Sequence, residues 1–184
     1  MPGVTSLTGR VEVKINWDYR FTPEFDAGDS PPIWVKTMLS RLDFEVSGDD
    51  TGQVDRLFAQ RRTVTSSTTT DDLDLSGTLL DIYGKTLDLE AVKLVAIFNQ
   101  GTLDGDNLLI GGAGAGNNAW GAPWGGDQDS QSICCPGVPY MWGNKFTGIL
   151  LTPGSQDTLR ITHDGISAEI DYDIVVMGTA INNL

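Results

Sequence analysis

The sequence predicts an all-β protein, and three observations lead to this class. Residues 9–19 read GRVEVKINWDY, in which Val11, Val13, Ile15 and Trp17 share one parity and polar residues share the other. Side chains alternate between faces along a strand, so this segment is an amphipathic strand. Residues 71–76 repeat the pattern, with Leu73 and Leu75 on the opposite parity from Asp72, Asp74 and Ser76. Turn-forming Gly, Asp and Asn separate short segments throughout, and no long amphipathic helix interrupts them.

The N-terminal segment is expected to supply strands or an arm. Residues 22–32 contain Pro23, Gly28 and the Pro31-Pro32 pair, which predict a loop. Residues 33–46 return to β character, and residues 48–52 predict a turn.

The middle of the chain contains one ambiguous segment. Residues 54–61 (VDRLFAQR) fit either a short helix or a bulged strand, and the Thr- and Ser-rich residues 63–70 fit an exposed strand or a linker. A strand follows at 71–76, a turn is expected at Gly84-Lys85, and residues 86–98 predict a strand that is split near Glu90.

The C-terminal half predicts further strands around one long loop. Residues 103–110 carry a turn into a short strand, and the glycines of residues 111–126 (GGAGAGNNAWGAPWGG) predict a loop. Strands are expected at 148–152, 158–162 and 166–177, with a hairpin at Asp164-Gly165. The continuously apolar residues 174–177 indicate a central strand that is buried on both sides.

Eight or more short strands at regular spacing predict a two-sheet sandwich, of which a jelly roll is the natural member. We expect a single domain over residues 1–184, with N-terminal strands or an arm in 1–50 and the main β module in 51–184.

The charge balance excludes several classes of partner. The chain has 12 Lys and Arg against 25 Asp and Glu, which gives a formal net charge of −13. Such a surface repels phosphate backbones and anionic membranes, so neither nucleic acid nor a membrane is an expected partner. The sequence shows no signal peptide and no run of 18 apolar residues, so we expect synthesis in a reducing cytoplasm.

No group of residues predicts catalysis, a cofactor or a metal. The glycines of residues 111–116 lack the Lys-Ser/Thr and the helix of a phosphate loop. The Asp104-Gly105-Asp106-Asn107 cluster is too short for a calcium loop and is interpreted as a turn. His163 has no nucleophile elbow to serve and is expected at the surface, and the adjacent Cys134 and Cys135 are interpreted as buried or half-buried free thiols.

Four aromatic residues form the candidate interaction site: Trp120, Trp124, Tyr140 and Trp142. They occur within 23 positions of a Gly- and Pro-rich region. Trp and Tyr bury much area with few rotors, so they anchor protein interfaces. Three interpretations remain open at this point: the residues fill the end of the sandwich, they form a protein interface, or they stack on a glycan.

Three short motifs resemble a small group of tailed-bacteriophage virion proteins. The first runs from Arg62-Thr63 through Asp72-Leu73-Asp74-Leu75 to Thr86-Leu87, and includes Gly77, Leu79, Asp81 and Tyr83-Gly84. The second is residues 107–112 (NLLIGG), and the third is residues 172–178 (YDIVVMG). The resemblance covers about residues 52–179. The Trp-rich insert with its two cysteines departs from the group pattern.

The resemblance implies a non-enzymatic structural protein on the capsid surface of a virion. Its expected role is that of a homotrimeric decoration (cement) protein that binds the major capsid protein and stabilises the assembled head. The alternative is a tail or fibre component with a glycan-binding site for a host sugar at the four aromatic residues. An enzyme that degrades polysaccharides would need a pair of carboxylates facing each other across a cleft, which a sequence cannot demonstrate.

Overall fold

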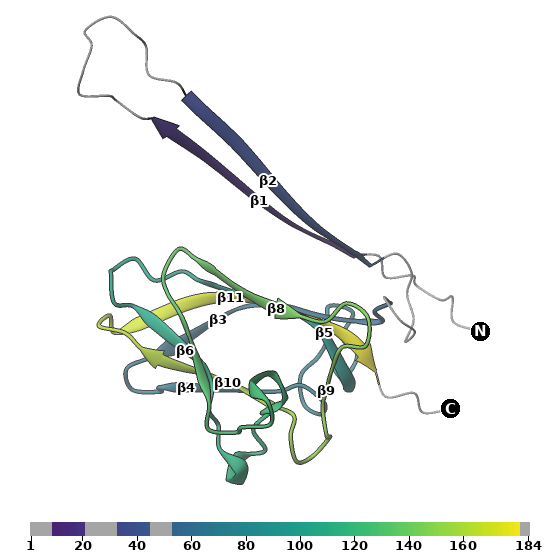
Figure 1. The fold of residues 1–184 in the computed structure, drawn as a ribbon. Helices are drawn as coiled ribbons and strands as arrows, with labels where there is room; N and C mark the ends of the chain where they lie inside the picture. Colours follow the sequence, from purple (N-terminus) through teal and green to yellow (C-terminus); the bar gives the residue numbers. More distant parts are fainter. Residues whose placement is uncertain (1–8, 21–32, 45–52, 181–184) are drawn as a thin grey trace, which may run out of the picture. The chain divides into compact units, whose positions relative to one another are not determined.

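The computed structural model describes residues 9–20, 33–44 and 53–180, with side chains for the last of these ranges (Figure 1). The chain divides into two compact units. One unit is a hairpin over Gly9–Phe44, and the other contains the β-sandwich.

The hairpin consists of β1 (Gly9–Arg20) and β2 (Ile33–Phe44), which pair antiparallel along their full length. The register sets Gly9 opposite Phe44 and Arg20 opposite Ile33. Both strands were predicted from the alternation of apolar residues. The loop expected at 22–32 and the turn expected at 48–52 lie outside the described residues.

The sandwich contains nine strands and two single-turn 3₁₀ helices within the described residues. The strands are β3 (Arg56–Thr65), β4 (Thr70–Asp74), β5 (Leu89–Asn99), β6 (Asn107–Gly111), β7 (Gln131–Cys134), β8 (Pro139–Gly143), β9 (Ile149–Leu150), β10 (Thr158–Asp164) and β11 (Glu169–Ala180). The 3₁₀ helices are η1 (Ala115–Asn117) and η2 (Ala122–Trp124). The predicted all-β class and the predicted sandwich are therefore confirmed.

Two antiparallel sheets form the layers of the sandwich. One has the order β3-β11-β5-β8, with β9 also paired to β5, and the other has the order β4-β10-β6-β7. Strands that follow each other in the chain, such as β3 and β4 or β10 and β11, occupy the same position in the strand orders of the two sheets. This order is compatible with a jelly roll, which stays a prediction, as does the single domain over residues 1–184.

The core lies between the two sheets and explains the apolar alternation. Leu73 and Leu75 are fully buried, as their parity predicted, and they belong to one core cluster with inward residues of β10 and β11 such as Leu159 and Ile174. Strand β11 lies between β3 and β5, and its last five residues are all buried. The predicted central strand is confirmed, with Val175 as the half-buried exception.

Two local predictions were ambiguous or wrong. Residues 56–65 form strand β3, so the helical alternative for residues 54–61 is excluded. The Asp164-Gly165 turn does not close a hairpin, because β10 pairs with β4 and β6 while β11 pairs with β3 and β5. The turn instead carries the chain from one sheet to the other. The side chain of Asp106 stabilises it by accepting hydrogen bonds from the backbone N–H and hydroxyl of Ser167.

Candidate functional site

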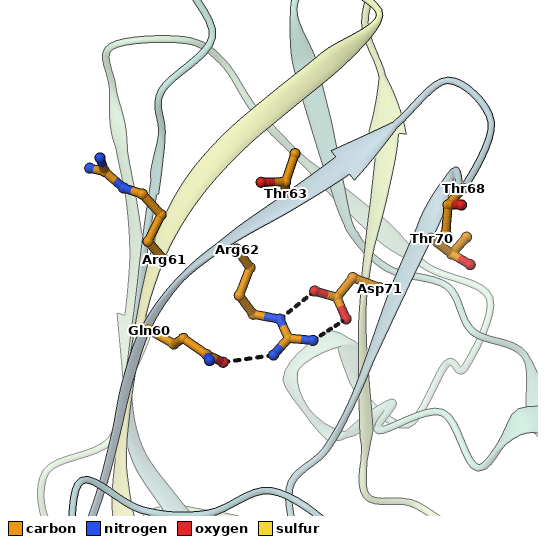
Figure 2. Close-up of a pocket in the computed structure, with 7 residues that line it drawn as sticks. All are labelled: Gln60, Arg61, Arg62, Thr63, Thr68, Thr70 and Asp71. Carbon is orange, nitrogen blue, oxygen red and sulfur yellow. Dashed lines mark hydrogen bonds and ion pairs between the residues drawn. The ribbon is translucent and has the colours of Figure 1, made fainter.

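The side of the sandwich where β3 and β4 are both edge strands holds a depression. It has a volume of about 380 Å³. Its lining comes from β3, β4 and the segment between them: Gln60, Arg61, Arg62, Thr63, Thr68, Thr70 and Asp71 (Figure 2).

A three-residue polar network ties the two sheets together at this depression. Arg62 of β3 donates two hydrogen bonds to the carboxylate of Asp71 on β4, and the Nη2–Oδ1 distance is 2.7 Å. Tyr172 of β11 donates its hydroxyl hydrogen to the same carboxylate over 2.6 Å. Figure 2 shows Arg62 directed at Asp71, with its remaining nitrogen on the side-chain oxygen of Gln60.

The network is structural in character because its groups satisfy one another. Burial and the neighbouring Asp71 carboxylate raise the pKa of Tyr172 far above its usual value, so the phenol stays protonated and donates. The hydrogen bond from Arg62 to Asp71 raises the pKa of the guanidinium, which stays charged. Neither Arg62 nor Tyr172 is therefore poised to exchange a proton near neutral pH.

The neighbouring carboxylates follow the alternation that the sequence predicted. Asp71 faces Arg62, whereas Asp72 pairs with Arg160 of β10 through two hydrogen bonds of 2.6 Å. On the outer face, Arg61 forms a similar pair with Asp173. Each of these guanidiniums has its own carboxylate, so none is left free to bind an anion.

A second depression of about 380 Å³ continues along β3 toward its beginning. It shares Gln60 and Arg62 with the first one and adds Phe58 and the loop from Thr78 to Ile82. This loop and the residue that follows it expose three large apolar side chains, since Leu80, Ile82 and Tyr83 have exposed fractions of 57%, 48% and 53%. The β3 edge is therefore polar at one end and apolar at the other.

Three of the four aromatic residues predicted as an interaction site, the tryptophans, come together in space. Their clustering involves rings of Trp120 and Trp142 with centroids 5.0 Å apart, and of Trp124 and Trp142 with centroids 6.3 Å apart. Trp120 is 1% exposed and donates its indole N–H to the carbonyl of Leu150, so it belongs to the core.

The other three aromatic residues are half-buried and pack against the core. Trp142 and Tyr140 lie on β8, and Trp124 donates its indole N–H to the hydroxyl of Ser132. Their contact with the core agrees with the interpretation that they fill the end of the sandwich. The buried indole of Trp120 has no face free for a sugar or a partner, and an interface at the other three stays a prediction.

The remaining candidate residues have structural roles. His163 is half-buried, with its ring nitrogens near the Ser167 carbonyl and the Gly165 N–H, so its expected surface position is only partly right. Cys134 is buried and free, whereas Cys135 is exposed, contrary to the expectation that both thiols are at least half-buried. The two thiols differ because adjacent side chains at the end of strand β7 point to opposite faces.

Within residues 53–180 no cluster of three or more His, Cys, Asp or Glu side chains could hold a metal ion. Among the described elements no helix has the length and apolar character needed to cross a membrane.

Several residues of the first motif, which runs from Arg62 to Leu87, stabilise turns in this part of the sandwich. The carboxylate of Asp74 accepts backbone N–H bonds from Ser76 and Thr78, and a side chain at Gly77 would collide with it. The buried Asp81 accepts the N–H groups of Tyr83 and Lys85, which closes the next turn. The motif thus encodes turns and sheet contacts.

No family model, no curated protein and no solved structure matches the chain.

Sequence reasoning did not find the network of Arg62, Asp71 and Tyr172. The alternation that places Asp71 and Asp72 on opposite faces can be seen in the sequence. An arginine among the inward-facing positions of residues 56–65 can be seen there too. The pairing partner was not visible, because it depends on which strand lies opposite in the other sheet.

Proposed function

We propose that the chain is a non-enzymatic structural protein of a tailed-bacteriophage virion, with a place on the capsid surface as a decoration protein. Its partner in this proposal is the major capsid protein. Its effect is to stabilise the assembled head, since a protein that binds only the assembled state shifts the equilibrium toward that state.

The observation that carries the proposal is the use of the virion-type motif in the fold. Arg62, Asp74 and Asp81 each have their polar atoms engaged in contacts that build the sandwich. A motif that resembles one of virion proteins and that serves structure here supports a structural role of the same kind. The polar lining of the first depression supports it too, because the charged side chains there are paired with one another.

The acidic surface is consistent with this role. A net charge of −13 disfavours direct contact with the packaged nucleic acid, and favours an outward position on the shell. The homotrimer expected from the sequence stays a prediction, as does the alternative of a tail or fibre component.

A binding experiment tests the proposal. Purified chain is mixed with assembled capsids that lack it, and separately with unassembled major capsid protein, and each mixture is sedimented. We expect co-sedimentation with capsids only. Capsids that have bound the chain should survive heating and osmotic shock better than bare ones.

Bare and complete particles of equal resistance would contradict the decoration role. Localisation of the chain to the tail or fibres in a reconstruction of the virion would favour the alternative. Measurable hydrolysis of a polysaccharide panel by the purified chain would contradict the non-enzymatic assignment.

A further inference from the structure

On the edge of β3 that faces away from β11, the middle of the strand has no hydrogen-bonded neighbour among the described residues. We call this unpaired stretch the window. Leu57 uses its carbonyl to accept the N–H of Ile82, and Thr65 donates its N–H to Thr68. These bonds show that odd-numbered residues of β3 direct their backbone groups away from β11. The next odd-numbered residues are Ala59, Arg61 and Thr63, and all three are exposed.

Within the part of the chain that the structure describes, these three residues leave six backbone groups without a partner. No hydrogen bond in the described part of the chain engages the N–H or C=O of Ala59, Arg61 or Thr63. Unpaired strand edges act as templates for another strand. The window is closed at both ends, by the Ile82 loop and by the bend after Thr65, so it accepts a strand of about five residues.

The window is symmetric about Arg61, which decides what fits it. In an antiparallel pair centred on Arg61, Ala59 lies opposite Thr63 of a second copy, and Thr63 opposite its Ala59. Directly opposed residues of this kind exchange both backbone hydrogen bonds. Every open group of one copy then meets an open group of the other.

We propose that two copies of this chain pair through their β3 edges around a two-fold axis, which joins the two five-stranded sheets into one. The side-chain pairs agree with this register. On the inward parity, Phe58 lies opposite Val64 of the second copy, and Gln60 lies opposite its Arg62. Both are compatible cross-strand pairs, the first apolar and the second polar, although Arg62 also donates to the Gln60 of its own chain.

In this register the Arg61 residues of the two copies lie opposite each other. They carry no unbalanced positive charge, because each is paired within its own chain. Each guanidinium is held by Asp173 of its own chain through two hydrogen bonds of 2.7 Å, so two neutral ion pairs meet at the axis. The register also brings Leu57 opposite Thr65 of the second copy. The exposed Leu80, Ile82 and Tyr83 beside Leu57 then lie near that copy's Thr-rich bend.

The pairing goes beyond the proposed virion role and does not depend on it, because it concerns the purified chain alone. A two-fold contact gives a dimer, or a hexamer if a three-fold contact exists as well. It does not give an isolated trimer.

The experiment is sedimentation velocity of the full chain over a range of micromolar concentrations, combined with residue-resolved amide exchange. We expect an even-numbered species whose formation protects the amides of Ala59, Arg61 and Thr63. Because each copy carries a charge of −13, self-association should strengthen as salt is added.

The Ala59→Pro variant removes the outward-facing N–H of Ala59 in each copy. A dimer of this variant therefore lacks two of the donors in the window. Proline is tolerated on an edge strand where the N–H faces outward, so the fold should survive. The loss of two hydrogen bonds should weaken association about tenfold or more. The matched control is Ala115→Pro, at the first position of η1, where proline is favoured and association should be unchanged.

Three results would overturn the proposal. They are a monomer at every concentration, an oligomer in which the three amides exchange as freely as in the monomer, and an oligomer that a folded Ala59→Pro variant leaves intact. If that variant does not fold, amide exchange of the unmodified chain decides alone.

Discussion

At the scale of single residues, the contact between the two sheets depends most on the carboxylate of Asp71. It accepts hydrogen bonds from Arg62 and Tyr172, which come from the opposite sheet. The Asp71→Ala variant leaves a partly buried guanidinium and a buried hydroxyl without their partner, and such orphaned groups cost about 1–3 kcal/mol each. We expect a loss of about 2–5 kcal/mol in urea unfolding.

Two further variants separate this network from ordinary ion pairing. The Tyr172→Phe variant removes a donor but leaves Asp71 with Arg62, so the loss should be only about 1 kcal/mol. The Asp173→Ala variant breaks an exposed pair and should have a smaller effect than Asp71→Ala. Equal losses for Asp71→Ala and Asp173→Ala would show that the network has no special role.

Three aspartates predict how stability depends on pH. Hydrogen bonds from Ser130 and Asp129 lower the pKa of Asp127, and those from Arg61 lower the pKa of Asp173. Burial alone would raise the pKa of Asp106, but hydrogen bonds from Ser167 and nearby backbone lower it overall. In the unfolded chain these groups titrate near pH 4.

A lowered pKa means that the folded state binds fewer protons than the unfolded state as the pH falls through this range. The contribution of these groups is therefore complete above about pH 4 and is lost on further acidification. We expect the urea concentration at the unfolding midpoint to decrease as the pH is lowered below about 4. This decrease should be smaller in the Asp106→Asn variant. Asp55 is the contrast, because burial raises its pKa and its contribution has the opposite sign. An unchanged acid profile in Asp106→Asn would contradict this account.

Among the strands, the pairing of β11 with β5 requires a glycine. The register shifts between Met177 and Gly178, and a side chain on Gly178 would collide with the carbonyl oxygen of Ala91. The Gly178→Ala variant must displace one of the two central strands. We expect a loss of about 1–3 kcal/mol, as for other overpacked interiors.

Gly116 supplies the matched control for this prediction. An added Cβ there meets no atom within 4 Å, and its backbone does not need a positive φ. The Gly116→Ala variant should therefore unfold at the same urea concentration as the unmodified chain, within error. A Gly178→Ala variant that is equally stable would mean that the bulge can relax.

The strands show how far a sequence can predict such a fold. Alternation located β1 and β4, and the continuously apolar residues 174–177 located the central strand, because burial on one face or both is directly reflected in residue type. The turn at Asp164-Gly165 was assigned to a hairpin wrongly, since a turn sequence does not say whether the next strand stays in the same sheet. The segment at 54–61 was ambiguous because β3 is an edge strand with exposed residues at both parities.

At the scale of the whole molecule, the candidate site was the least predictable feature. Aromatic residues drew attention to Trp120, which the structure places in the core. The open β3 edge consists of Ala59, Arg61 and Thr63, whose side chains carry no distinctive signal. What distinguishes them is the free state of their backbone groups, and that depends on strand order, which no local pattern encodes.

The division of the chain into two units predicts two steps of unfolding. The hairpin has two strands, and a two-stranded hairpin alone is only marginally stable, whereas the sandwich has a continuous core. We expect amides of β1 and β2 to exchange through openings of lower free energy than amides of β5 and β11. Hydrogen exchange across a range of low urea concentrations measures both.

Tryptophan fluorescence supplies an independent check on the same point. Trp17 and Trp34 lie in the hairpin, and the other three tryptophans lie in the sandwich. A Trp17→Phe, Trp34→Phe double variant reports the sandwich alone, and its urea transition should match the later of the two steps. Coincident exchange of both units at the global free energy of unfolding would contradict the prediction. The hairpin would then share the cooperativity of the sandwich, as the single domain expected over residues 1–184 requires.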